Sequence, residues 1–440
     1  MAISRRTFLG NAAAFAVASR ALAAAAPDVS VFEQSGRRAA DFLICRRLYL
    51  DICGRLPTKE EVRSFVASGK QGKCEKLIDE LLASDGFADF WSMRYCDCLR
   101  VKSEFPINLW PNAVYVYHRR IRAAAAQDEP WDAFARALLL GRGSNFRVPE
   151  ANFMRALARR TPEGLSEAAT ATFLVDPSEE YARCFSRVGW KPTREWKEEV
   201  VYLKDGPADA TPEAFLELLE GPLRVRFHAA PVRRVHWWLF GSMPAPDRLK
   251  EWTAVFEKGG LRMKPLLRYV FNSPAYRAGP IRGGFPARRL DAEVLDDAIC
   301  DLTGMQRNFQ SIAPEPFTFL PPARRSILIE DGSITSAFLL LFGRPARDSG
   351  LLEERNNTIT AKQRLYLFNS GSLWDGLGRI ERDPYFRKMD RREQLEDVFM
   401  RFLSRPPTKA ELFLVDRKAA LSIREISWLL VNSREFLYRI

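Results

Sequence analysis

The stretch GRLPTKEE at residues 54–61 decides the fold, because it returns as SRPPTKAE at residues 404–411. In both copies a Pro-Thr pair follows an apolar segment of helical period, and a glutamate stands three positions after the threonine. This arrangement predicts that one helix ends and the next begins at a capping box, formed in the first copy by Thr58 and Glu61. We therefore expect both threonines to cap helices rather than to take part in catalysis.

The similarity between the two copies continues downstream. Ser84 and Phe87 follow the first copy, and Ser433 and Phe436 follow the second at nearly the same spacing, while a weaker third copy spans residues 246–273. Such spacing indicates a duplicated helical hairpin. The alternative is that helix-cap chemistry simply recurs without duplication.

Apolar periodicity predicts helices along most of the chain and few strands. The sequence therefore predicts a mainly α fold of two helical domains, built from repeated capped helical hairpins with few short strands. The clearest predicted helices are residues 41–53, 76–82, 114–125, 131–140, 287–303 and 391–403, and the clearest strands are 200–203 and 326–329.

The segment KDGPAD at residues 204–209 is polar, carries Gly and Pro, and lies between apolar elements, which is typical of a domain boundary. We expect an N-terminal helical domain at residues 27–204, a linker at 205–222 and a C-terminal helical domain at 223–440.

The first 26 residues have the features of a twin-arginine signal peptide. SRRTFL at residues 4–9 precedes a short apolar stretch and an alanine run at residues 21–26. The alternative is a short N-terminal helix or anchor, although the apolar run is much shorter than the ~20 residues of a membrane span. We expect export by the twin-arginine route to the periplasm or cell envelope. Cleavage would remove three arginines and no acidic residue, which lowers the net charge from +12 to +9.

Composition narrows the classes of protein that this chain can represent. Its 440 residues are 47% hydrophobic, so it can bury a large core, and its mean hydropathy of −0.23 excludes a bundle of membrane spans. Only three histidines and seven cysteines occur, with no Cys-x-x-Cys pair. We therefore expect no metal site, no Ser-His-Asp or Cys-His catalytic set and no Gly-rich phosphate loop.

Many ordered segments resemble a family of exported planctomycete and verrucomicrobial proteins in which domain of unknown function 1549 precedes domain of unknown function 1553. The segments that resemble the first domain are RRLYLD (46–51), GRLPT (54–58), LLAS (81–84), FW (90–91), VKSEFPINLWPNA (101–113), GSNFR (143–147) and WKEE (196–199). Those that resemble the second are WLFG (238–241), NSPAY (272–276), PARRLDAE (286–293) and FGRPARD (342–348).

Many members of the first family carry a haem-binding Cys-x-x-Cys-His after a Phe-Leu pair. In this chain Phe173-Leu174 is followed by a segment in which only Cys184 remains, with Phe185 after it. Either Tyr181 and Phe185 replace a cysteine and the histidine, or the segment is shortened past the motif. Both alignments remove a thioether and the axial ligand, so we expect no covalently bound haem and no other cofactor.

Four polar segments are candidates for ligand contact. In residues 102–112, Asn108 and Trp110 lie between two prolines with Glu104 just before them, and the segment could form a binding loop. The alternative is that Phe105, Leu109 and Trp110 fill the core. Asn145 and Arg147 in the turn at 143–147 could bind an oxygen-rich ligand.

The other two candidate segments carry several charges. Glu198 and Glu199 could act as acid and base, or form the solvated face of a helix. In residues 343–358, arginines alternate with acidic residues, so they could clamp a sulfate, phosphate or carboxylate, or pair with one another across the domain interface. The candidates in this last segment are Arg344, Arg347, Asp348, Glu354, Arg355 and Asn356.

The sequence leaves the molecular function open. We expect a non-catalytic binding or assembly component that acts beside exported polysaccharide-handling enzymes. The alternatives are a hydrolase that uses carboxylates such as Glu104 or Glu354 on an anionic glycan, and a redox-complex subunit that has lost its cofactor. Anionic polysaccharides or other exported proteins are the expected partners, and not nucleic acid, which an exported protein seldom meets.

Overall fold

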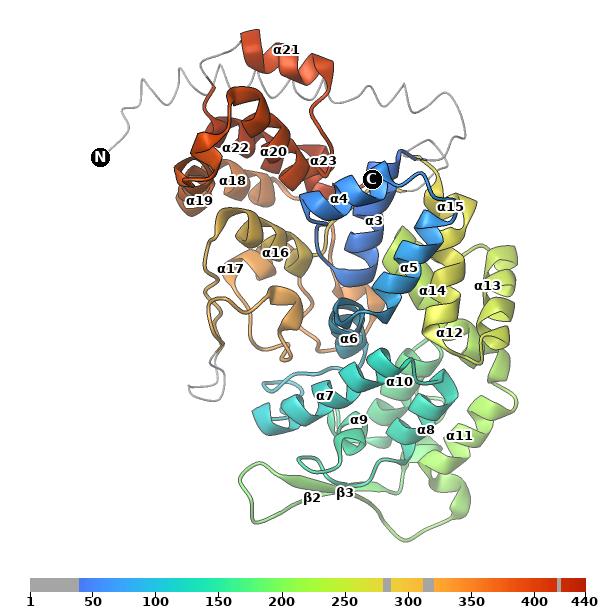
Figure 1. The fold of residues 1–440 in the computed structure, drawn as a ribbon. Coiled ribbons are helices and arrows are strands. Elements are labelled where there is room, and N and C mark those ends of the chain that lie inside the picture. Colours follow the sequence, from blue (N-terminus) through green and yellow to red (C-terminus); the bar gives the residue numbers. More distant parts are fainter. Residues whose placement is uncertain (1–38, 280–285, 312–319, 418–420) are drawn as a thin grey trace.

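The computed structural model describes residues 39–279, 286–311, 320–417 and 421–440. The predicted signal peptide at residues 1–26 therefore lies outside the described residues. The described chain is mainly helical with two small sheets, which confirms the predicted fold class (Figure 1).

Among the described residues, eight α-helices precede β2 in the first half of the chain: α3 Asp41–Cys53, α4 Lys59–Ala67, α5 Lys73–Ala83, α6 Asp85–Cys98, α7 Pro111–Gln127, α8 Trp131–Leu140, α9 Asn152–Arg155 and α10 Pro162–Phe173. The sheet contains β1 Gly143–Ser144, β2 Val188–Pro192 and β3 Glu199–Leu203, in the order β1-β3-β2 with antiparallel neighbours. The next helices are α11 Pro212–Glu220, α12 Arg224–Phe240, α13 Pro246–Lys258, α14 Met263–Asn272 and α15 Pro274–Arg277.

The remainder holds α16 Ala292–Thr303, α17 Ala337–Leu341, α18 Ala361–Asn369, α19 Gly371–Arg382, α20 Arg391–Leu403, α21 Lys409–Arg417, α22 Ile423–Val431 and α23 Arg434–Leu437. A two-stranded antiparallel sheet joins β4 Arg288–Arg289 to β5 Tyr438–Arg439. None of the helices in the described ranges is both long enough and apolar enough to cross a membrane.

The predicted helix caps are confirmed by their hydrogen bonds. Thr58 Oγ1 accepts from the Glu61 N–H at 3.2 Å while the Glu61 carboxylate accepts from the Thr58 N–H at 2.7 Å. Thr408 and Glu411 repeat both bonds at the same distances. Ser84, Ser273 and Ser433 each cap the helix that follows them. The third copy is weaker at its start, because its N-cap Ala245 offers no side-chain acceptor.

Three expected elements differ in the structure. Residues 288–289 form β4, so the helix expected from residue 287 begins only at Ala292. The expected strand at 326–329 is a short 3-10 helix, because the N–H groups of Ser326 and Ile327 donate to the buried Asp297 carboxylate instead of to a neighbouring strand. The expected helical face around residues 195–199 is the tip of the β2–β3 hairpin.

The N-terminal helices lie between two parts of the later chain. In Figure 1 the blue helices α3–α5 are flanked by α20 and α23 on one side and by α14 on the other, and α5 packs on α14. Arg46 donates to the Phe402 carbonyl at 2.9 Å, and Arg47 donates to the Ile440 carbonyl at 3.0 Å. The range expected to be a linker contains α11, whose Phe215 is fully buried.

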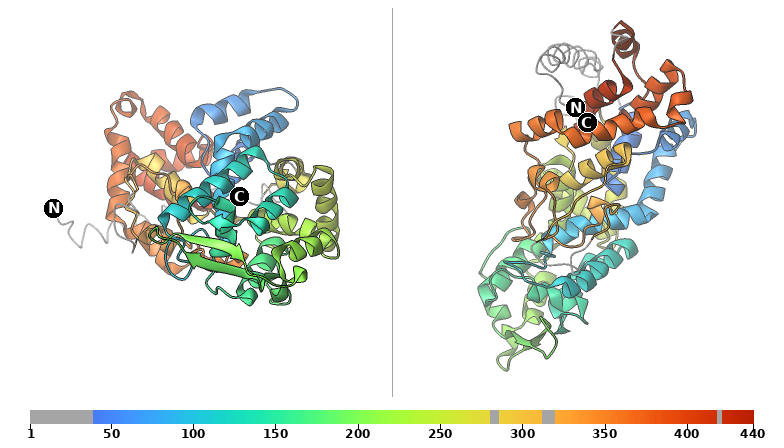
Figure 2. Two further views of the ribbon diagram at one scale, coloured as in Figure 1. Left: turned by 90° about the horizontal axis from the view of Figure 1, so that it is seen from below. Right: turned by 90° about the vertical axis from the view of Figure 1, so that its left-hand side faces the viewer.

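The β2–β3 hairpin lies at one end of an elongated molecule (Figure 2). Because β3 pairs with both β1 and β2, this sheet fixes the hairpin tip relative to the turn at residues 143–147. The hairpin is therefore a rigid support for any site at its tip.

Candidate functional site

A cavity of about 960 Å³ opens beside the tip of the hairpin. Residues from the 103–110 segment, which connects α6 to α7, form one part of its wall, and residues 192–199 form another, together with Arg155 and Arg160. We call this cavity the hairpin groove. The predicted residues Glu104, Asn108 and Trp110 all line it.

Aromatic side chains from both walls meet in the hairpin groove. The rings of Trp110 and Trp196 lie edge to face, with centroids 6.5 Å apart and an interplanar angle of 83°. Trp196 is 71% exposed and Phe105 is 80% exposed. Large aromatic surfaces are usually buried, so two that face solvent at one cavity make its wall an exposed apolar surface.

Arg155 connects the two walls of the groove. Its guanidinium donates to the carbonyls of Ile107 at 3.0 Å and Asn108 at 2.7 Å, and it forms an ion pair with Glu199 at the start of β3. Burial lowers the pKa of Arg155 to about 10. Arg160 also pairs with Glu199, at 2.8 Å. These bonds hold the 103–110 segment against the hairpin.

Glu198 connects the hairpin tip to the turn at residues 143–147. Its carboxylate is 5% exposed and accepts from the hydroxyls of Ser144 and Thr193, and the bond from Ser144 is the main reason that the pKa of Glu198 is lowered. Arg147 Nε lies 3.5 Å from the same carboxylate. A carboxyl group held ionised in this way is poorly suited to donate a proton as a general acid.

The predicted residues of the 143–147 turn support the groove without lining it. Asn145 is fully buried, and its side-chain oxygen accepts from the Glu199 N–H at 2.8 Å. The Arg147 side chain is 75% exposed. The turn therefore belongs to the base of the hairpin groove.

The backbone of the groove contains residues in rarely populated conformations. Trp110 has φ 71° and ψ 147°, in a region that is occupied almost only by glycine, and Asn108 and Lys197 also have positive φ. Strain of this kind persists where surrounding structure enforces it and is concentrated at functional sites. It favours a functional role for these loops over that of a simple connector.

The alternative for the 102–112 segment was that three of its apolar side chains fill the core. Only one of the three does so. Leu109 is fully buried, whereas Phe105 is exposed and Trp110 is half-buried at the groove.

Two cations of the hairpin tip face solvent. Arg194 and Lys197 are exposed, and within the described parts of the chain neither forms an ion pair. Lys197 Nζ lies 5.1 Å from the centroid of the Trp196 ring, which is a cation–π distance. Their charges are therefore available to an anionic ligand.

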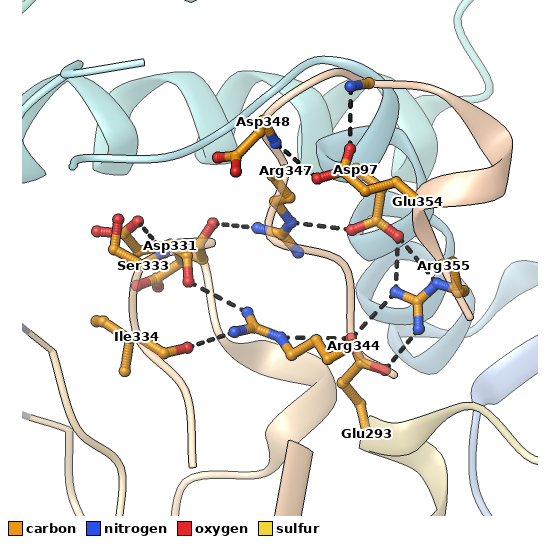
Figure 3. Close-up of polar contacts among 12 residues, drawn as sticks. Asp97, Glu293, Asp331, Ser333, Ile334, Arg344, Arg347, Asp348, Glu354 and Arg355 are labelled. Carbon is orange, nitrogen blue, oxygen red and sulfur yellow. Dashed lines mark hydrogen bonds and ion pairs between the residues drawn. The ribbon is translucent and has the colours of Figure 1, made fainter. Parts of the chain in front are cut away.

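The arginines of the 343–358 segment lie elsewhere, in a buried network (Figure 3). Arg347 and Arg355 both bind the carboxylate of Asp97 on α6, at 2.9 and 2.6 Å. Arg355 also binds the fully buried Glu293, at 2.6 Å. Burial by itself would lower the pKa of Arg355, but Asp97 and Glu293 raise it well above its usual range.

The remaining predicted residues of this segment also bond within the protein. Arg344 donates to the carbonyls of Ile334 and Asp331. The Glu354 carboxylate accepts from the backbone N–H groups of residues 348–350. Asn356 contributes a carbonyl that accepts from Arg289 at 3.0 Å. The structure thus favours internal pairing over the clamping of a ligand. The acidic partners are Asp97 on α6 and Glu293 on α16.

The buried network nevertheless reaches the hairpin groove. The Ser103 N–H donates to Asp331 at 2.9 Å, and the Glu104 N–H donates to Ser333 at 3.0 Å. Figure 3 labels the acceptors Asp331 and Ser333. Lys102 binds Asp348 at 2.6 Å. The second half of the chain therefore positions the wall of the groove that the first half supplies.

Sequence reasoning missed several residues of the groove. Arg155, Arg160, Arg194 and Thr193 belong to no motif, and their role follows only from the packing of the hairpin against the 103–110 segment. Trp196 lies close to Glu198 and Glu199 in the sequence, and an aromatic residue in such a polar segment could have indicated a binding site. No group of three or more His, Cys, Asp or Glu side chains suited to a metal ion occurs among the described residues.

Comparison with known families agrees with the paired resemblance. Residues 33–189 match the model PSCyt2, described as protein of unknown function (DUF1549), and residues 239–417 match the model PSD1, described as protein of unknown function (DUF1553). No curated protein and no solved structure matches the chain. The chain therefore belongs to the proteins in which these two families of unknown function are paired in this order, in a form without the haem motif.

Proposed function

We propose that this protein is a non-catalytic binding component that holds a segment of an anionic polysaccharide in the hairpin groove. The observation that carries the proposal is the aromatic pair of Trp110 and Trp196 next to Arg194 and Lys197, two exposed cations that form no ion pair with any described residue.

Each group in the groove matches a feature of such a ligand. Sugar rings have apolar C–H faces that pack on aromatic rings, and removing both surfaces from water is favourable. Arginine and lysine pair with sulfate or carboxylate substituents, and arginine can do so with two hydrogen bonds. The carboxylates of Glu104 and Glu195, which also line the groove, can accept hydrogen bonds from sugar hydroxyls.

Export places this activity in the periplasm or cell envelope, beside enzymes that handle polysaccharides. The twin-arginine pattern at residues 4–9 supports this location, and the net charge of +9 that would remain after cleavage supports an anionic partner.

Hydrolysis of an anionic glycan is the second candidate, because Glu104 and Glu198 line the same groove. The lowered pKa of Glu198 fits only the ionised member of a hydrolytic pair, so Glu104 would have to act as the acid. Glu354, the other candidate carboxylate, does not line the groove and is bound to backbone N–H groups.

A titration series tests the binding proposal. Heparin, chondroitin sulfate and polygalacturonate serve as anionic probes, and N-acetylchitohexaose serves as an uncharged probe. We expect at least one anionic probe to bind, more weakly as salt rises, and the uncharged probe to bind at least tenfold more weakly. Trp196→Ala should weaken binding about tenfold, which corresponds to ~1.4 kcal/mol, and Arg194→Gln with Lys197→Gln should reduce the salt dependence.

The matched control is Arg268→Gln, which removes an exposed, paired arginine on α14 away from the groove. It should leave binding unchanged. If no anionic probe binds, or if all three variants bind equally well, the proposal is wrong. Chromatography of the incubated probes distinguishes hydrolysis, which requires shortened products that disappear in Glu104→Gln.

A further inference from the structure

A second, much smaller cavity of about 20 Å³ lies where α3, α6, α12 and the β4–β5 sheet meet. Charged side chains dominate its lining, and they are Asp51, Arg94, Arg288, Arg289, Asp291 and Arg439. It is separate from the hairpin groove, with which it shares no lining residue.

The lining carries more positive than negative charge. Asp291 pairs with Arg94 at 2.8 Å, and Asp51 pairs with Arg439. Each of the two carboxylates is thus already engaged by an arginine.

Arg288 and Arg289 form no ion pair within the described chain and donate to backbone carbonyls instead. Arg288 binds the Trp237 carbonyl at 2.7 Å, and Arg289 binds the Phe342 carbonyl at 2.6 Å. Four guanidinium groups therefore face two carboxylates at one cavity.

Arg94 supplies hydrogen-bond donors that no described group accepts. Its side chain is 4% exposed, and neither Nε nor Nη1 has a hydrogen-bond partner within the described chain. Buried donors in native proteins are nearly always satisfied, by protein groups or by a bound water or ion. Burial lowers the pKa of Arg94, as expected for a cation whose charge is incompletely compensated.

We propose that this cavity binds one small monovalent anion, of which chloride is the physiological representative. The excess of guanidinium groups favours negative charge, and Arg94 offers free N–H donors to it. The volume exceeds the ~10–15 Å³ that one water-sized particle requires, and its small size favours a monatomic anion over sulfate or phosphate. A water molecule would satisfy donors but would not compensate the charge.

The anion would stabilise the contact between α6 and the β4–β5 sheet. Arg94 belongs to α6, whereas Arg288 and Arg439 belong to the β4 and β5 strands that hold the C-terminus. A ligand that binds the folded state and not the unfolded state raises stability in proportion to the logarithm of its concentration.

The test measures the melting temperature of the full chain in sodium chloride, sodium bromide and sodium gluconate at matched ionic strength and pH. We expect the melting temperature to rise with each tenfold increase in chloride or bromide and to stay constant in gluconate, which is too large for the cavity. Arg94→Gln should abolish the halide response, whereas Arg268→Gln, which changes an exposed arginine on α14, should keep it.

A crystal of the unmodified protein in bromide provides a second measurement that does not depend on the folding of any variant. The proposal requires an anomalous bromide peak within hydrogen-bonding distance of Arg94 Nε or Nη1. Equal melting temperatures in halide and gluconate would overturn it, as would bromide peaks only on surface arginines with a water in the cavity.

Discussion

Arg355 Nη2 lies 2.6 Å from Asp97 Oδ2, although 258 positions separate the two residues in the sequence. Arg347 binds the other oxygen of the same carboxylate at 2.9 Å. One aspartate on α6, whose side chain is 14% exposed, is therefore shared by two arginines of the 343–358 segment, and it connects the first matched family region to the second.

Asp97→Asn should destabilise the protein by about 3–5 kcal/mol, because it leaves two buried guanidinium groups without their shared counter-charge. Equilibrium unfolding in urea measures this change. The matched control is Asp79→Asn, which breaks the half-exposed pair with Arg268 and should cost less than about 1 kcal/mol. Equal losses in the two variants would show that the Asp97 network is not a buried one.

Gly343→Ala should destabilise the protein by at least about 2 kcal/mol. An added Cβ would lie 1.8 Å from the Asn356 carbonyl oxygen, and the φ of 78° is unfavourable for alanine. Gly371→Ala is the control, since its Cβ would meet nothing within 4 Å at the start of α19 and should change stability by less than about 0.5 kcal/mol. A mild effect of Gly343→Ala would mean that the close approach of the 343 and 356 backbones is not maintained in solution.

His118 on α7 should make the protein sensitive to acid. Burial, together with the positive charges of Arg347, Arg324 and Arg122, lowers its pKa in the folded state to about 3, compared with an ordinary value of 6.5. The unfolded state therefore binds more protons between these values, so this contribution to stability is fully present above pH 6.5 and is lost as the pH falls toward 3. At pH 5 the loss should be ~2 kcal/mol relative to pH 7.5.

The check compares wild type with His118→Gln in urea unfolding at pH 7.5 and pH 5. At pH 7.5 the imidazole is neutral in both states, so the difference there reports packing alone. The variant should lose ~2 kcal/mol less than wild type between the two pH values. Parallel losses would assign the acid sensitivity to other groups.

Local features of the fold could be predicted from the sequence because their cause lies within a few residues. The cap formed by Thr58 and Glu61 needs only its own turn and the start of α4, and the same holds for Thr408 and Glu411. The expected strand at 326–329 failed because its backbone donors are bound by Asp297, about 30 positions away. Such a side chain leaves no trace in the local apolar pattern.

The same distinction applies to the candidate site. Trp110 and Asn108 were predicted because their loop is polar and bounded by prolines, and they line the groove. The ligand-clamping alternative for Arg347 and Arg355 could not be decided from the sequence, because their partner Asp97 lies about 250 positions earlier. Arg155 was missed for the same reason, since its partners lie in two segments about 45 positions away on either side of it.

The most direct test of the central claim is hydrogen–deuterium exchange of the full chain with and without the anionic polysaccharide that binds most tightly in the titration series. If the polysaccharide binds in the hairpin groove, we expect slower exchange in peptides covering residues 103–110 and 193–198, with little change in the buried network around Asp97. Protection confined to another face of the molecule, or binding that leaves both groove segments unchanged, would contradict it.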